Sequence, residues 1–252
     1  MLNIFLAPTS RFRQLGARPD WTIPFILALV IPLLIGTLSV ILMPRETLIN
    51  STETRINRAK EFIDQQIEKG RMPSDQRQPA LERIEQASRS ELEFYQQASK
   101  ASLFLRFILR SLPAVVWSSL QLLIWTAILN LLLPLLGASA SFGRMFAITA
   151  NSALVRILAA LFHGLLILFT GRLTASTSLI PLGAGAPLYL KGVLACIDIF
   201  TIWELILTTI GIKVVFNLSG KRTAAAVFSI WLLYILLLAG FFTLSGGLAL
   251  PE

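Results

Sequence analysis

Residues 21–43 read WTIPFILALVIPLLIGTLSVILM and carry no charged side chain. A hydrocarbon core about 30 Å thick is crossed by roughly 20 apolar residues in an α-helix, so this run predicts a transmembrane helix. The run is longer than the ~7–15 apolar residues of a signal peptide. Pro44 and Arg45 follow it, where small residues would mark a cleavage site. We therefore expect a helix that is not cleaved off.

The whole chain has the composition of a membrane protein. Of its 252 residues, 55% are hydrophobic and 14% are charged, whereas soluble domains carry about 25% charged residues. Further apolar runs of sufficient length occupy residues 111–142, 145–170, 193–216 and 223–250. The expected fold class is therefore all-α, a polytopic membrane helix bundle with five transmembrane helices. Its parts are residues 1–20, 21–43, 44–111 and 112–252, the last being a four-helix transmembrane region.

Lysine and arginine are distributed unevenly among the short loops of this arrangement. Loops on the side of the N-terminus hold Arg11, Arg13, Arg18, Arg144, Lys213, Lys221 and Arg222, and the opposite loop holds Arg172 and Lys191. Because cytoplasmic loops are rich in these residues, we expect a cytoplasmic N-terminus and an extracytoplasmic C-terminus. Residues 1–20 are amphipathic and are expected to lie in the headgroup layer. The net charge of +8 is scattered, which favours lipid headgroups over nucleic acid as its partner.

Residues 44–111 hold twelve of the basic and ten of the acidic residues of the chain. Apolar side chains recur at helical spacing over residues 46–69, Gly70 and Pro73 interrupt the pattern, and residues 81–98 resume it. This predicts an extramembrane, extracytoplasmic helical hairpin between the first two transmembrane helices. No strong breaker lies between Ala80 and Leu112, so the second hairpin helix can run straight into the second transmembrane helix.

Four ionisable side chains lie within the third and fourth apolar runs. Arg156 and His163 are about two turns apart in the third run, and the fourth run contains Asp198 and Glu204. Such groups cost at least about 2.5–3.5 kcal/mol at membrane depth and need partners or water. The two helices must be antiparallel, and the helical rise then brings Arg156 level with Glu204. It also brings His163 level with Asp198, so we predict both pairs.

Two interpretations of these pairs stay open. In the first, the pairs neutralise buried charge and fix the register of the two helices. In the second, they form a proton or ion relay in which His163 titrates near neutral pH. Thr201, Thr208 and Thr209 extend a polar stripe along the fourth helix, which would line a water-filled cavity under the second interpretation.

The sequence offers no recognisable catalytic motif. Ser245 precedes Gly246 and follows Leu244, so the glycine expected before a nucleophilic serine is absent, and no nucleophile–base–orienter set can be assembled. One histidine, His163, and one cysteine, Cys196, cannot build a zinc site. We therefore expect a protein that is not an enzyme and that holds neither a metal nor a cofactor.

Short motifs flank several of the apolar runs. FLAPTSRF at 5–12 and RPDW at 18–21 precede the first, FGRMF at 142–146 leads into the third, and DIFTIWE at 198–204 lies in the fourth, followed by Gly211. Together, over residues 1–43 and 112–245, they resemble the bacterial branch of the Yip1-domain family of five-span membrane proteins. The motif residues include Pro8, Phe12, Pro19, Trp21, Trp203 and Gly211.

The resemblance implies a non-enzymatic integral membrane protein of the bacterial inner membrane with a cytoplasmic N-terminus. Eukaryotic members act in Golgi and endoplasmic-reticulum trafficking and contact small GTPases. The acidic-glycine-proline motif that those members carry before the first span is absent here, and residues 44–111 are inserted. Bacterial members are associated with export assemblies of the ABC type, so the implied partners are ABC exporter components.

Two functional hypotheses follow from these features. The leading one is a membrane accessory or scaffold protein whose extracytoplasmic hairpin docks a protein partner, such as an ABC-type export or efflux assembly. The alternative is a small transporter or proton-coupled carrier that uses the intramembrane side chains Arg156, His163, Asp198 and Glu204.

Overall fold

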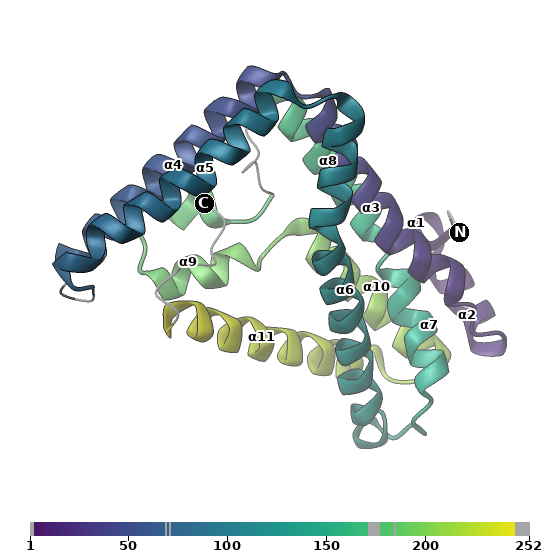
Figure 1. Cartoon of the computed structure of the whole chain (residues 1–252). Helices are drawn as coiled ribbons and strands as arrows, with labels where there is room; N and C mark the ends of the chain where they lie inside the picture. The colour runs from purple at the N-terminus through teal and green to yellow at the C-terminus, as the bar shows by residue number, and fades with distance from the viewer. Residues whose placement is uncertain (1–2, 69, 71, 171–176, 184, 245–252) are drawn as a thin grey trace. The chain divides into compact units, whose positions relative to one another are not determined.

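The computed structural model is helical throughout its described residues, which are 3–68, 70, 72–170, 177–183 and 185–244 (Figure 1). Strand-like pairing among them is limited to one isolated antiparallel bridge between Ser178 and Asp198. The predicted all-α fold class is therefore confirmed. The helices are α1 (Asn3–Leu6), α2 (Pro8–Ala17), α3 (Thr22–Leu42), α4 (Arg45–Glu68), α5 (Arg77–Gln97), α6 (Lys100–Leu132), α7 (Phe142–Ser152), α8 (Val155–Thr170), α9 (Leu188–Ala195), α10 (Ile199–Val215) and α11 (Gly220–Leu244), with 3₁₀ turns at Ser74–Gln76, Pro134–Leu136 and Ile180–Gly183.

Residue contacts divide the chain into two compact units, each with its own core. Unit 1 comprises Met1–Ile35, Ser111–His163 and Ser176–Glu252, and unit 2 comprises Gly36–Arg110 and Gly164–Ala175. The core of unit 1 is formed by side chains of the N-terminal helices and of α6, α7, α10 and α11. The core of unit 2 contains Val40, Met43, Leu48, Tyr95, Ala98 and Leu103.

Four helices of the described residues are long and apolar enough to cross a membrane. They span Thr22–Leu42, Lys100–Leu136, Phe142–Thr170 and Gly220–Phe241 and correspond to the first, second, third and fifth predicted runs. Large apolar side chains on them face outwards, for example Leu131 and Leu237, which are 74% and 67% exposed. Lipid is the environment that accepts such surfaces, so the chain is an integral membrane protein.

The fourth predicted crossing, residues 193–216, is not one continuous helix. α9 ends at Ala195, and α10 begins at Ile199 and has 17 residues. Asp198 sets this restart, because its Oδ1 accepts the backbone N–H groups of Phe200 at 2.7 Å and Thr201 at 3.3 Å. That is the arrangement of a helix N-cap. Asp198 is therefore the N-cap of a helix and does not lie within one, contrary to what the apolar run predicted.

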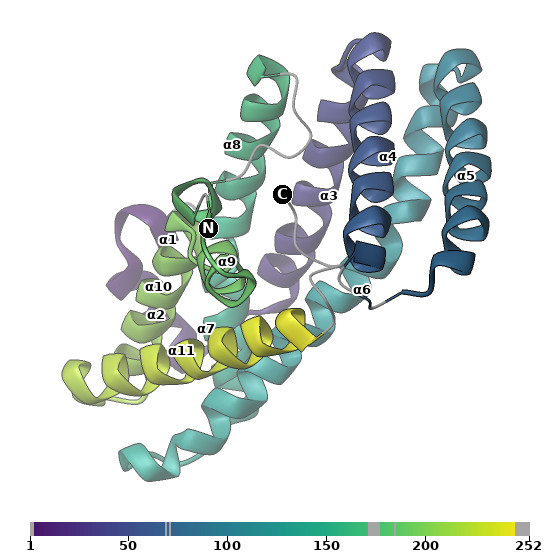
Figure 2. The ribbon, with the colours of Figure 1, turned by 90° about the vertical axis from the view of Figure 1, so that its left-hand side faces the viewer.

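In unit 2, α4 and α5 lie side by side and antiparallel (Figures 1 and 2). Leu48 and Tyr95, one from each helix, are buried in the core of this unit. Ion pairs between exposed or half-buried side chains set the register of the two helices more than they stabilise them. The pairs join Arg55 to Glu91, Lys60 to Glu85 at 2.6 Å and Arg77 to Asp64 at 2.7 Å.

A break at Ala98 and Ser99 separates α5 from α6, so the straight continuation that the sequence allowed does not occur. Ala98 is extended, and the Ser99 hydroxyl accepts the backbone N–H of Ser102 at 3.1 Å. Arg45 donates to the carbonyls of Gln96 at 3.1 Å and Ala98 at 2.7 Å. Carbonyls at a helix end have no partner within the helix, and Arg45 supplies one from the start of α4.

Unit 1 is built around α10, which contacts α2, α7 and α11. The N-terminal helices provide Ile4, Phe12 and Leu15 to its core, each at most 1% exposed. These apolar residues of the segment 1–20 therefore have partners within the protein, and the location of this segment in the headgroup layer stays a prediction. α9 packs along α11 in the same unit.

Candidate functional site

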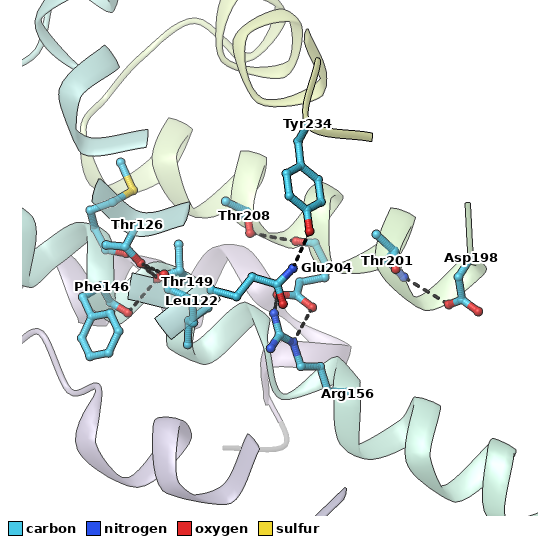
Figure 3. A network of polar contacts seen from close by, with 12 residues as sticks. Leu122, Thr126, Phe146, Thr149, Arg156, Asp198, Thr201, Glu204, Thr208 and Tyr234 are labelled. Atoms are coloured by element: carbon cyan, nitrogen blue, oxygen red, sulfur yellow. Dashed lines mark hydrogen bonds and ion pairs between the residues drawn. The ribbon is translucent and has the colours of Figure 1, made fainter. Parts of the chain in front are cut away.

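The central feature of unit 1 is an ion pair between Arg156 of α8 and Glu204 of α10. The Arg156 Nε and Nη2 atoms each lie 3.0 Å from one oxygen of the Glu204 carboxylate, and Figure 3 shows the two side chains directed at each other. A two-point contact of this kind combines charge with fixed geometry. The side chains are 30% and 17% exposed in the chain alone. The structure thus brings together the first pair named in the sequence analysis.

Arg156 lies directly after an interruption of the third apolar run. α7 ends at Ser152 and α8 begins at Val155. At the junction the N–H of Arg156 donates to the carbonyl of Ala153 at 2.9 Å. Hydrogen bonds to the third preceding residue tighten the backbone locally and redirect a helix. The interruption therefore places Arg156 in the first turn of α8.

The second predicted pair, His163 with Asp198, is indirect. The Thr177 hydroxyl lies 3.0 Å from His163 Nε2 and also donates to Asp198 Oδ2. The Thr177 backbone N–H lies 3.3 Å from the same histidine nitrogen. The prediction of a direct contact between His163 and Asp198 was wrong. Asp198 caps α10 through its other oxygen, Oδ1, and the Thr177 hydroxyl lies between Asp198 and His163. We call these five residues the polar cluster; they form two separate hydrogen-bonded groups, Arg156 with Glu204, and His163 with Thr177 and Asp198.

The threonines of α10 are occupied by their own helix. The hydroxyl of Thr208 donates to the carbonyl of Glu204 at 2.8 Å, and Thr209 donates to Leu205 at 2.8 Å. Thr201 is bound through its backbone N–H to the Asp198 cap (Figure 3). Thr208 is only 1% exposed. A threonine that returns its hydroxyl to the preceding turn offers no free donor, so Thr208 does not act as a lining of a wet cavity.

The motif residues of the N-terminal helices meet those of α10. Phe12 is fully buried, and its ring lies against Gly211, where an added Cβ would come within 2.8 Å of the Phe12 Cε1 atom. The same added Cβ would also collide with Ile148 of α7. At one end of the contact between the N-terminal helices and α10, the rings of Phe5 and Trp203 pack edge to face, with their centroids 5.8 Å apart. α1 and α2 therefore run alongside α10, in the same direction.

A second set of motif residues ties the start of α3 to α7. Asn151, which is fully buried, donates to the carbonyl of Asp20 at 3.0 Å and accepts from Arg11 Nε at 3.2 Å. The ring of Trp21 lies 5.1 Å from that of Phe146 between centroids. Pro8 starts α2 and Pro19 lies in the link to α3. Asn151 was not among the predicted site residues, although a lone amide in an apolar run signals a buried hydrogen-bonding role.

The chemistry available at the polar cluster is charge neutralisation and proton exchange among hydrogen-bonded groups. Among the described residues, no three histidine, cysteine or carboxylate side chains are grouped as metal ligands would be. A buried hydroxyl pair, Thr126 with Thr149 at 2.6 Å, lies elsewhere in the same unit (Figure 3). In the described part of the chain, Ser152 Oγ is the buried side-chain polar atom that lacks a partner.

Comparisons with known proteins extend these observations. The family model for the Yip1 domain matches residues 2–242, and thus nearly the whole chain. None of the curated proteins and none of the solved structures matches it. The match includes the insertion at residues 44–111, which the sequence resemblance had left out.

The contact of Phe12 with Gly211 predicts a strict size limit at position 211. Gly211→Ala should destabilise the chain by about 1–3 kcal/mol, because overpacking forces Phe12 or Ile148 to move. The melting temperature in mild detergent, followed by tryptophan fluorescence, should fall by several degrees.

The matched control is Gly143→Ala in α7, where an added Cβ meets no heavy atom within 4 Å. Its melting temperature should be unchanged or slightly higher, since alanine favours helices over glycine. Equal melting temperatures for the two variants would show that α2 does not pack on α10 as described.

Proposed function

The chain belongs to the Yip1 domain family, and from this premise we propose that it is a non-enzymatic membrane scaffold whose α4–α5 hairpin docks a protein partner outside the membrane. The Yip1 family is in general one of non-enzymatic membrane proteins. The partner class that the family resemblance suggests is an export or efflux assembly of the ABC type in a bacterial inner membrane. The observation that carries the proposal is the polar outer surface of the hairpin.

That surface is extended and regular. α4 has 24 residues and α5 has 21, so the pair is about 30–36 Å long. On α5 the exposed side chains repeat at helical spacing: Glu82, Gln86, Arg89, Glu93 and Gln97. Both signs of charge alternate along this row, which suits a partner with a complementary charge pattern. Because the ion pairs between α4 and α5 fix the register, the row is presented on a rigid support.

We also propose the topology that this function requires. The N-terminus is cytoplasmic and the hairpin is extracytoplasmic. α9 with α10 forms an interrupted crossing, the fourth along the chain, which brings the number of crossings to five and leaves the C-terminus outside. Interrupted helices are tolerated at membrane depth where protein encloses them. The packing of α10 against α2, α7 and α11 supports such an enclosure. The pairing of Glu204 with Arg156 removes the main cost of placing α10 there.

Photo-crosslinking in native membranes tests the docking surface. A crosslinking amino acid at Glu82 and at Arg89, which face outwards, should trap one and the same protein. The same amino acid at Leu48, which is 2% exposed in the hairpin, is the control and should trap none. The double charge reversal Glu82→Arg and Arg89→Glu should weaken docking. With the crosslinking amino acid at a third exposed position, Glu93, the yield of the crosslinked partner should then fall at least fivefold.

A labelling control shows on which side of the membrane the α4–α5 hairpin lies. In a Cys196→Ser background, a cysteine at Glu82 should react with a membrane-impermeant maleimide added from outside. Adducts limited to lipid or to a second copy of the chain, with several crosslinking chemistries, would refute the scaffold function. Protection of the Glu82 cysteine until the membrane is opened would refute the proposed topology.

A second candidate function is a proton-coupled carrier, and the contact of Thr177 with both His163 and Asp198 favours it. Three groups that can exchange protons are in hydrogen-bond contact there, next to the interruption between α9 and α10. Binding sites of many transporters lie at such interrupted helices. The competing explanation is that Asp198 serves only as the cap of α10.

Asp198→Asn separates these two roles, because asparagine caps a helix as well as aspartate does but carries no charge. If the chain is a carrier, reconstituted vesicles should show a proton-driven flux that Asp198→Asn abolishes without lowering the melting temperature. Asp198→Ala is the control for the cap and should lower that temperature. A flux that is equal in the wild type and in Asp198→Asn would exclude the relay.

A further inference from the structure

An open groove in unit 2 has almost wholly apolar walls, to which two arginine residues contribute mainly their aliphatic stems. Its volume is about 560 Å³, and it is lined by Phe94 of α5 and by Ser102, Leu105, Arg106, Leu109 and Arg110 of α6. Leu105 and Leu109 are 58% and 55% exposed. None of these residues belongs to the polar cluster or to the outer row of α5.

The position of the groove along α6 is at the boundary of the hydrocarbon core. Arg110 is the last charged residue before the uncharged run 111–142, and Arg106 lies one turn earlier. Side chains at this point of a transmembrane helix reach the phosphate layer of the bilayer. Leu105 and Leu109 are offset from them by one residue, so they face the lipid at the same height.

The charges of the groove are only partly neutralised. Glu91 contacts both Arg110, at 3.1 Å, and Arg55, so one carboxylate is shared between two guanidinium groups. Burial of Glu91 opposes its ionisation, but Arg55, Tyr95 and Arg110 outweigh this effect and hold the pKa of Glu91 below its ordinary value of 4.5. Even with Glu91 ionised, the groove keeps an excess of positive charge.

Arg106 is held in place without being neutralised. Its guanidinium carbon lies 4.0 Å from the centroid of the Phe94 ring. Stacking on an aromatic ring fixes the plane of an arginine and leaves its N–H edges free to donate. Within the described part of the chain, Arg106 has no carboxylate partner. A planar, oriented guanidinium of this kind matches the oxygens of a phosphate group.

We propose that an anionic phospholipid binds here, with an acyl chain in the apolar groove along Leu105 and Leu109 and its phosphate on the guanidinium groups of Arg106 and Arg110 at the border of the groove. The charge excess favours an anionic lipid over a zwitterionic one. The apolar walls at the membrane boundary favour a lipid over a soluble anion, because a soluble anion would leave the leucines without a partner. The site is independent of the docking function proposed for the outer row of α5.

Native mass spectrometry of the full chain in mixed micelles tests the site. Phosphatidylglycerol should be retained in preference to phosphatidylcholine of the same chain length. Arg106→Gln should reduce that preference about fivefold, the effect expected of one arginine near an anionic surface. Arg89→Gln, an exposed arginine of α5 outside the groove, is the matched control and should leave it unchanged.

A variant that is expected to retain more phosphatidylglycerol distinguishes the loss of a binding site from misfolding of the chain. Glu91→Gln removes the carboxylate shared by Arg55 and Arg110, so it should strengthen retention of phosphatidylglycerol, which a misfolded chain would not do. Equal retention of the two lipids, or equal losses in Arg106→Gln and Arg89→Gln, would overturn the proposal. Competition by water-soluble glycerophosphoglycerol at the concentration of the lipid would overturn it too, because the site would then bind a free anion.

Discussion

The ion pair between Arg156 and Glu204 is the interaction on which unit 1 depends. α10 carries the ionisable residues Glu204 and Lys213, Asp198 lies directly before it, and each of the three has a defined place. Asp198 caps the helix, Glu204 binds Arg156 through both oxygens, and Lys213 lies in the last turn, where the helix dipole favours a cation. Without Arg156, Glu204 would be a charge in apolar surroundings with no partner, which is far more costly than the pair itself.

The motif residues that mark the family have a common structural meaning. Phe12 and Gly211 allow α2 to approach α10 closely, Phe5 and Trp203 close one end of that contact, and Asn151 binds Asp20 at the entry to α3. These contacts join the N-terminal helices to α7 and α10. Short motifs that are far apart in the sequence are therefore parts of one packed joint, and nothing in their geometry requires a catalytic role.

Much of the architecture could be predicted from the sequence because long apolar runs are a strong signal. The helices containing residues 22–42, 100–136, 142–170 and 220–241 lie where the apolar runs indicated them. The approach of Arg156 to Glu204 followed from helical rise alone. The family assignment, made from degenerate motifs, agrees with the family model over residues 2–242 and is confirmed.

The remaining features depend on local capping and on tertiary contacts, which periodicity does not reveal. Asp198 and Ser99 each cap the start of a new helix, although the apolar pattern of the sequence continues through both positions. Neither break is marked by a glycine or a proline, so periodicity alone does not reveal it. The N-terminal helices pack Phe12 and its apolar neighbours on α10, which the sequence could not reveal because an amphipathic pattern looks the same for a protein or a lipid partner. Thr177, which separates His163 from Asp198, lies outside every predicted helix and could not be placed from spacing.

The central claim is that Arg156 and Glu204 hold α8 and α10 together through a direct contact. A double-mutant cycle with Arg156→Met and Glu204→Gln, measured as the free energy of unfolding in detergent, tests it most directly. Each single variant should lose about 3 kcal/mol, and the double variant should lose clearly less than the sum. Arg144→Gln, at an exposed position of α7, is the control and should change little. Strictly additive losses for Arg156 and Glu204 would contradict the account.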